Sequence, residues 1–164
     1  MAQVDYFIKF DSIEGESVDA THKGSIELLS FSWGLHNNLV ASTGAARAGR
    51  PSFEDFHFTA HSSKASPKLF LAAAKGSLQH SATLSARKTA GTEGKAQDFL
   101  VVKMENVLIS SYNEAATQNG QDDFPADSVS LNFAKITFTF VPQNPSGESG
   151  APVTESWDLR AQKQ

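Results

Sequence analysis

The stretch Gly24-Ser25-Ile26-Glu27-Leu28-Leu29-Ser30-Phe31-Ser32-Trp33-Gly34 decides the fold of this chain. Large apolar residues alternate with small ones over its second half, in the order Leu29, Ser30, Phe31, Ser32, Trp33, Gly34. Because successive strand residues point to opposite faces, this alternation predicts a strand with one apolar face and one small, mildly polar face. Free domains usually carry charges on their solvent face, so neutral hydroxyls favour a surface that lines a space or lies against a neighbour.

The composition is that of one globular domain over residues 1–164. The chain is 40% hydrophobic and 20% charged, which excludes both a disordered and a membrane-spanning protein. A formal net charge of -4 disfavours nonspecific binding to nucleic acid, which needs a basic surface. The absence of cysteine rules out disulfides and thiol chemistry and favours folding in a reducing cytosol.

The first eleven residues do not have the pattern of a signal peptide. Asp5, Lys9 and Asp11 interrupt any apolar segment, and a basic region before it is missing. We therefore expect that, if the protein leaves the cell, it does not use the general secretory route.

Strand patterns recur along most of the chain. Beside the quoted stretch, we expect strands over residues 4–10, 53–60, 81–87, 97–111, 128–141 and 153–160. The stretch 36–51 is rich in small residues and glycine and predicts an exposed, mobile loop. The apolar positions of 128–141 change from odd to even near Phe133, which predicts a bulge or sharp twist there.

One segment has the pattern of a short helix, about residues 66–75. Ser66 is a good N-cap, Pro67 suits the first turn and Gly76 suits the end. Its buried face is expected to contain Leu69, Phe70 and Ala73. The chain is thus predicted to be mainly β: a β-barrel of two antiparallel sheets with one short α-helix. An immunoglobulin-like sandwich explains the helix less well.

The sequence contains no pattern typical of catalytic, cofactor-binding or metal-binding residues. His57 and His61 would lie about 13 Å apart on one strand, too far to share a zinc ion. The carboxylate pairs Glu14/Glu16, Glu54/Asp55 and Asp122/Asp123 are typical of solvated loops rather than of a glycosidase cleft. We therefore expect no cofactor and no enzymatic activity.

Several short motifs, in this order and spacing, closely resemble the haemolysin-coregulated protein (Hcp) family, the tube protein of the bacterial type VI secretion system. The resemblance runs from about Asp5 to Arg160. The motifs are Phe7-Ile8-Lys9, Gly15-Glu16-Ser17, His22, 26–34, 53–58, Ser66-Pro67-Lys68-Leu69, Val129-Ser130-Leu131-Asn132-Phe133 and Trp157-Asp158-Leu159-Arg160.

The resemblance implies a structural role. Such proteins fold as a β-barrel of two sheets flanked by a short helix, and six copies form a ring with a wide channel. Rings stack into a tube inside a contractile sheath, and the tube is expelled, tipped by a spike, into a neighbouring cell. The ring also carries and protects small effector proteins. The resemblance thus implies a cytoplasmic protein that is later secreted without a signal peptide.

It also implies roles for particular residues. Ser32 matches the lumen-facing serine in the Trp-Ser-Trp segment of the family, and in this chain Phe31 stands in place of the first tryptophan. Ser30 shares the face of Ser32. The stretch 43–50 corresponds to an extended loop that touches the next ring. Its expected stacking residues are Thr43, Gly44, Arg47, Gly49 and Arg50.

Three other functions are alternatives to that of the secretion tube protein. A secreted toxin with a fused C-terminal enzyme is not expected, because the chain ends at Gln164 soon after the last expected strand. A phage-like tail-tube protein shares the expected architecture. A small ligand-binding β-barrel would not form rings.

Overall fold

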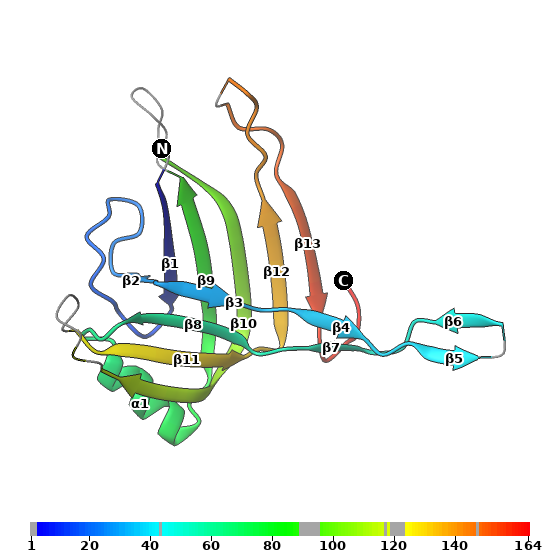
Figure 1. Ribbon diagram of the computed structural model, residues 1–164, viewed down its shortest axis with the longest axis horizontal. Helices are drawn as coiled ribbons and strands as arrows, with labels where there is room; N and C mark the ends of the chain where they lie inside the picture. The colour runs from blue at the N-terminus through cyan, green and yellow to red at the C-terminus, as the bar shows by residue number, and fades with distance from the viewer. Residues whose placement is uncertain (1–2, 43, 89–95, 117, 119–123, 147) are drawn as a thin grey trace.

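The structure is a computed structural model that describes residues 3–42, 44–88, 96–116, 118, 124–146 and 148–164. It is mainly β, with antiparallel sheets and one short helix, as the sequence predicts (Figure 1). Two sheets share one long strand, β10 (Gln97–Ala115), and pack across a common core. The two sheets therefore contribute side chains to one hydrophobic core.

The first sheet has strand order β2-β1-β9-β10-β12-β13. Its other strands are β1 (Val4–Phe10), β2 (Ile26–Glu27), β9 (Gln79–Lys88), β12 (Lys135–Phe140) and β13 (Val153–Asp158). The second sheet has order β10-β11-β8-β3, with β11 (Ala126–Asn132), β8 (Phe56–His61) and β3 (Ser30–Ser32). Strand β10 pairs with β9 as far as Val107 and with β11 from Leu108 onward, so it passes into the second sheet between these residues.

The predicted strand over 24–34 is in fact two strands in two sheets. The amide of Leu28 donates to the Tyr6 carbonyl of β1 at 2.8 Å, and the next amide, of Leu29, donates to the Thr59 carbonyl of β8 at 2.8 Å. The chain thus changes sheet between neighbouring residues. At this corner Leu29 is 51% exposed, so the apolar face predicted from the alternation does not pack into the core at this residue.

The irregularity predicted near Phe133 is also a change of sheet. The predicted long strand over 128–141 ends as β11 at Asn132 and restarts as β12 at Lys135. Strand β11 pairs with β8 and β10, whereas β12 pairs with β10 and β13. The odd-to-even slip near Phe133 therefore marks a corner rather than a bulge within one strand.

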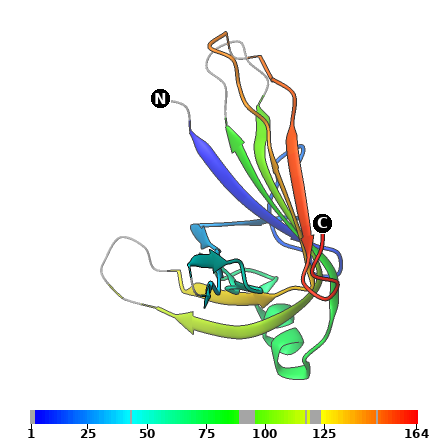
Figure 2. The same cartoon turned by 90° about the vertical axis from the view of Figure 1, so that its right-hand side faces the viewer.

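The helix α1 (Ser66–Lys75) covers one end of the core below the two sheets (Figure 2). It buries Leu69 and Ala72, but Phe70 is 58% exposed, so the predicted buried face is wrong at that residue. Gly76 ends the helix in the left-handed conformation, as predicted. Ser66 is the first helical residue rather than the N-cap, and its hydroxyl bonds to Asp127 instead of to the helix backbone.

Residues 35–53 form a long arm rather than the predicted loop. Strands β4 (Leu35–Asn37) and β7 (Pro51–Phe53) pair at its base, and β5 (Val40–Ser42) and β6 (Ala45–Arg47) pair toward its tip. The arm projects from one end of the body along the long axis of the molecule (Figure 1).

Candidate functional site

One face of the second sheet carries short, uncharged polar side chains. Cross-strand partners share a face, and residues two apart on one strand do too, so the pairing registers define it. We call it the hydroxyl face. Its members are Ser30, Ser32, His57, Thr59, Ser111, Asn113, Ser128 and Ser130.

The opposite face of the same strands forms the core. Phe56, Phe58, Val129 and Leu131 alternate with the hydroxyl face and are fully buried. Phe31 stacks on Phe56 with ring centroids 5.9 Å apart. This packing fixes the strand orientation, so the hydroxyl face is held outward by the core.

Hydrogen bonds run across the hydroxyl face. Ser30 Oγ and Thr59 Oγ1 lie 2.6 Å apart, and His57 Nδ1 and Ser130 Oγ lie 3.1 Å apart. Asp55, the residue before β8, lies at the margin of this face and accepts a hydrogen bond from Ser110 Oγ at 2.6 Å. The face is therefore a smooth surface on which charged groups stand only at the edge.

The arm depends on two glycines. Gly44 has φ +101°, a left-handed conformation that side chains disfavour, at the turn between β5 and β6. At Gly49, a Cβ atom would lie 1.8 Å from the carbonyl oxygen of Asn38, and the Gly49 amide donates to Asn37 Oδ1 at 2.8 Å. The two strands of the arm thus approach closely only because residue 49 lacks a side chain.

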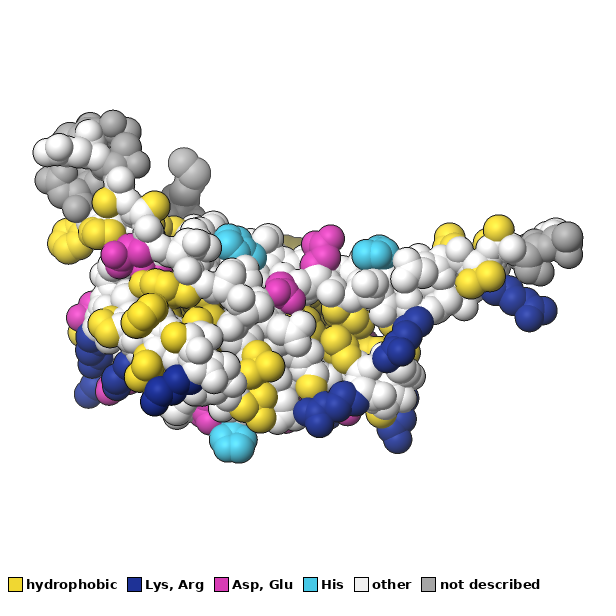
Figure 3. Space-filling view, turned by 90° about the horizontal axis from the view of Figure 1, so that it is seen from below, with side chains coloured by type: hydrophobic (Ala, Val, Ile, Leu, Met, Phe, Trp, Pro, Cys, Tyr) yellow, Lys and Arg dark blue, Asp and Glu magenta, His cyan; other side chains and the backbone are white. Residues whose placement is uncertain are grey.

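The arm exposes both apolar and basic side chains. Leu39 and Val40 are 67% and 59% exposed. Arg47 and Arg50 are exposed, and within the described residues neither forms an ion pair. Figure 3 shows dark blue Lys or Arg side chains on the arm.

The first sheet leaves part of its core-side face uncovered. The second sheet covers only its lower portion (Figure 2). On this face Phe140 pairs with Val153 and Phe138 pairs with Glu155. Phe140 is 43% exposed, Val153 60% and Phe138 37%. Phe138 contacts Trp33 with ring centroids 5.6 Å apart, so this apolar surface continues to the base of the arm.

A buried carboxylate joins the helix to the second sheet. Asp127, on β11, is 2% exposed and accepts hydrogen bonds from Ser62 Oγ at 2.8 Å, from Tyr112 at 2.9 Å and from Ser66. Three hydroxyl donors replace the cation that a buried carboxylate usually needs. Sequence reasoning missed this cluster.

The cluster predicts a dependence of stability on alkaline pH. Burial and the neighbouring Asp127 raise the pKa of Tyr112 to about 12, from an ordinary value near 10. The folded state therefore keeps a proton that the unfolded chain releases, and stability should fall as the pH rises from 10 toward 12.

We expect Tyr112→Phe to be less stable than the parent near pH 8 by about 1 kcal/mol, because one hydrogen bond is lost. This difference should narrow between pH 9 and 11.5, since the variant lacks the titrating group. Urea unfolding of both proteins across this range is the measurement. A difference that stays constant with pH would contradict the assignment.

The polar loop between β1 and β2 is fastened to the outer side of the first sheet. His22 Nε2 contacts Asp98 Oδ1 at 2.8 Å and its ring stacks on Phe7, while Arg87 pairs with Asp19. The backbone amides of His22 and then Thr21 lower the pKa of Asp19 below its usual value. These contacts hold the loop against the first sheet.

The described residues contain no cluster of three or more His, Asp or Glu side chains that could hold a metal ion. His57 lies on the hydroxyl face, whereas His36, His61 and His80 are exposed. Asp122 and Asp123 lie outside the residues that the structure describes. None of the helices in the described part of the chain has the length and apolar character needed to span a bilayer.

The structure brings some of the predicted site residues together. Ser30 and Ser32 lie side by side on the hydroxyl face, and Gly44, Arg47, Gly49 and Arg50 all lie on the arm. Thr43 lies outside the described residues. The other members of the hydroxyl face could have been found from the alternation of polar residues with Phe56, Phe58, Val129 and Leu131.

Comparisons with known proteins cover nearly the whole chain. A family model described as "Type VI secretion system effector, Hcp" matches residues 7–140. Protein hcp1 of Pseudomonas aeruginosa is 34% identical over 159 residues, which are 96% of each chain. A solved structure of a type six secretion system protein matches with a TM-score of 0.89 and 30% identity, covering 98% of this chain and 99% of the other. Hcp1 from Salmonella typhimurium matches with a TM-score of 0.81 and 28% identity, covering 99% of both.

Proposed function

Because the chain belongs to the Hcp family of type VI secretion effectors, we propose that it is a subunit of the secretion tube. Six copies close into a ring, and rings stack into an inner tube within a contractile sheath and behind a spike. The tube is exported with small effector proteins in its lumen. In this role the protein is not an enzyme but a structural subunit, whose function depends on the symmetric assembly of identical copies.

The observation that carries the proposal is the hydroxyl face. Four strands present short side chains without a charge among them, where a free surface would usually carry charges. A wall of this kind leaves a channel wide and binds cargo by many weak, reversible contacts. We assign the hydroxyl face, with Ser30 and Ser32, to the lumen.

Ring closure needs two different surfaces on each copy. The uncovered apolar surface of Phe138, Phe140 and Val153 supports such a contact, since contiguous exposed apolar patches commonly mark protein interfaces. The arm supplies the contact between rings, through Thr43, Gly44, Arg47, Gly49 and Arg50. Both contacts are heterologous: the first closes by rotation, whereas the second repeats along the tube.

Family membership also supports the location of the protein. The family is a secretion family. We place the protein in the bacterial cytoplasm before firing and in the extracellular space or the target cell afterwards, without insertion into a membrane and without nucleic acid.

Light scattering with negative-stain electron microscopy tests the ring. The expected mass is six times the 17.6 kDa of one chain, and the expected particle is a ring with an open centre. A protein that stays monomeric at every concentration would refute the proposal.

A substitution on the hydroxyl face tests the lumen assignment. Ser32→Gln adds a longer polar side chain to an exposed position, so we expect intact rings that retain about tenfold less effector. Quantitative mass spectrometry of proteins that co-purify with tagged rings, normalised to ring mass, is the measurement. Ser149→Gln, at an exposed serine in the loop after β12, is the control and should retain effectors normally. Equal retention by the two variants would refute the lumen role of Ser32.

A further inference from the structure

A groove lies at the end of the molecule opposite to the arm. Its volume is about 380 Å³, and we call it the acidic groove. It lies between the loop after β1, the β2–β3 corner and the end of β8, all of which are at the far end of the long axis from the arm (Figure 1). Its rim includes Glu16, Val18, Glu27, Leu29 and His61.

The lining of the acidic groove combines apolar surface with negative charge. Val18 is 93% exposed and Leu29 is 51% exposed, which are high values for aliphatic side chains. In the part of the chain that the structure describes, Glu16 and Glu27 form no ion pair. The residues that line the groove include no lysine and no arginine. The nearby Lys64 is 3.8 Å from Glu14 and therefore has its own partner.

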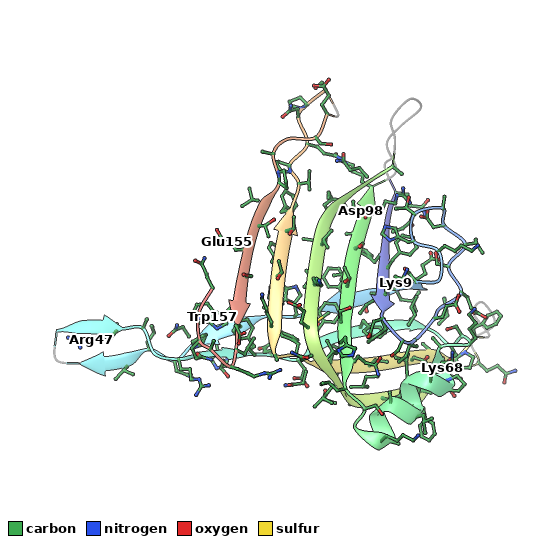
Figure 4. The ribbon with its side chains drawn as sticks, turned by 180° about the vertical axis from the view of Figure 1, so that it is seen from behind. Lys9, Arg47, Lys68, Asp98, Glu155 and Trp157 are labelled. Atoms are coloured by element: carbon green, nitrogen blue, oxygen red, sulfur yellow. The ribbon has the colours of Figure 1, made fainter. Side chains whose placement is uncertain are left out.

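The arm has the complementary character. Residues 35–50 contain Arg47 and Arg50 but no aspartate or glutamate. Val40 is the cross-strand partner of Arg47 in the β5–β6 hairpin, so an aliphatic and a cationic side chain lie on one face of the arm. Figure 4 shows Arg47 near the tip, well away from the body. The arm therefore offers an apolar side chain and a positive charge, which complement the exposed apolar residues and the carboxylates of the groove.

We propose that the arm of one copy docks in the acidic groove of a second copy in the next ring. The inference rests on the proposed function, and it names the surface that receives the arm. Val40 packs against Val18 and Leu29, and Arg47 approaches Glu16 and Glu27. Arm and groove lie at opposite ends of one long axis, so the contact is head-to-tail (Figure 1). Between copies of successive rings, such a contact repeats along the tube.

The lack of native cysteine allows a direct test. We would introduce Val40→Cys in the arm and Val18→Cys in the groove of the same chain, purify assembled protein and oxidise it. Both valines are largely exposed, so neither change threatens the core. The matched control combines Val40→Cys with Leu78→Cys, a residue 55% exposed just after the helix.

Docking should raise the local concentration of the two thiols, so we expect at least about tenfold more cross-linked protein than in the control. On denaturing, non-reducing gels the products should form a ladder that continues beyond six chains. If the yield of cross-linked protein does not exceed that of the control although microscopy shows rings and tubes, the acidic groove is not the docking site of the arm. The proposed tube function would still stand in that case. A ladder that stops at six would place the contact within one ring and overturn the assignment between rings. Absence of any ring by light scattering would instead refute the proposed function.

A charge exchange gives a second, independent test. Glu27→Arg alone should reduce tube formation by about tenfold or more, because it faces Arg47 with a like charge. Combining it with Arg47→Glu should restore tubes, whereas combining Glu155→Arg on β13 with Arg47→Glu should not. Ring mass should be unchanged throughout. Failure of the exchange to restore tubes would overturn the pairing of Arg47 with Glu27.

Discussion

Replacing Asp127 by alanine is expected to lower the free energy of unfolding by about 3 kcal/mol, because charge-assisted hydrogen bonds to three hydroxyls are lost. The Ser66 hydroxyl, in a residue that is 6% exposed, would then have no acceptor in the protein interior. Since Ser66 begins α1, we expect the helix to detach from the second sheet first. Urea unfolding monitored by circular dichroism measures the loss.

The matched control for this change is Asp55→Ala. Asp55 also accepts from two side chains, Ser110 and Asn132, but it is exposed. Its loss should therefore change stability by less than about 1 kcal/mol. Asp127→Asn keeps an acceptor oxygen and should fall between the two. Equal effects of Asp127→Ala and Asp55→Ala would contradict the role given to the buried cluster.

Gly49→Ala is expected to abolish tubes while leaving rings unchanged. The added methyl group would lie 1.8 Å from the backbone oxygen of Asn38, so the two strands of the arm must separate. The displaced atom is backbone, and side-chain rotation cannot relieve the overlap. We expect tube yield to fall by more than about tenfold with little change in the unfolding midpoint, since the arm lies outside the core.

Gly34→Ala is the control, at the base of the same arm. A Cβ atom there would meet its nearest neighbour, Glu54 Oε2, at 3.5 Å, an ordinary contact. Tube yield from this variant should match the parent, as measured by sedimentation and electron microscopy. Wild-type tube yield from Gly49→Ala would show that the arm does not join rings.

The sequence predicts the hydroxyl face only in part. The pattern around Ser30 and Ser32 is visible because large apolar residues alternate with them. His57, Thr59, Ser128 and Ser130 obey the same alternation, but which strands lie side by side depends on pairing between distant segments. Local periodicity cannot supply that pairing.

The corners show a second limit of local patterns. At Leu28 and Leu29 two adjacent large side chains break the alternation, and the chain crosses from one sheet to the other. The residues alone do not distinguish such a crossing from a slip within one strand. The arm was predicted as a loop for a related reason: its hairpins are held by backbone pairing and by close approach at Gly49, which leave little hydrophobic periodicity.

The Asp127 cluster could be predicted only in part. Asp127 has the same parity as Val129 and Leu131, so strand alternation places it on the core face, but the hydroxyl donors that make its burial possible come from distant segments. Its burial follows from the position of α1, whose first residue and preceding loop bring Ser66 and Ser62 to it. Ser66 has the composition of an N-cap, yet tertiary contact gives its hydroxyl a different acceptor.

Strand β10 has 19 residues, an extended length of roughly 60 Å. It belongs to both sheets, so a mechanical load on the hydroxyl face passes along covalent backbone into the apolar surface of the first sheet. Two sheets joined only by noncovalent side-chain contacts would instead separate under the same load. The two sheets of the subunit are therefore coupled through one continuous backbone, which passes from the first sheet to the second between Val107 and Leu108.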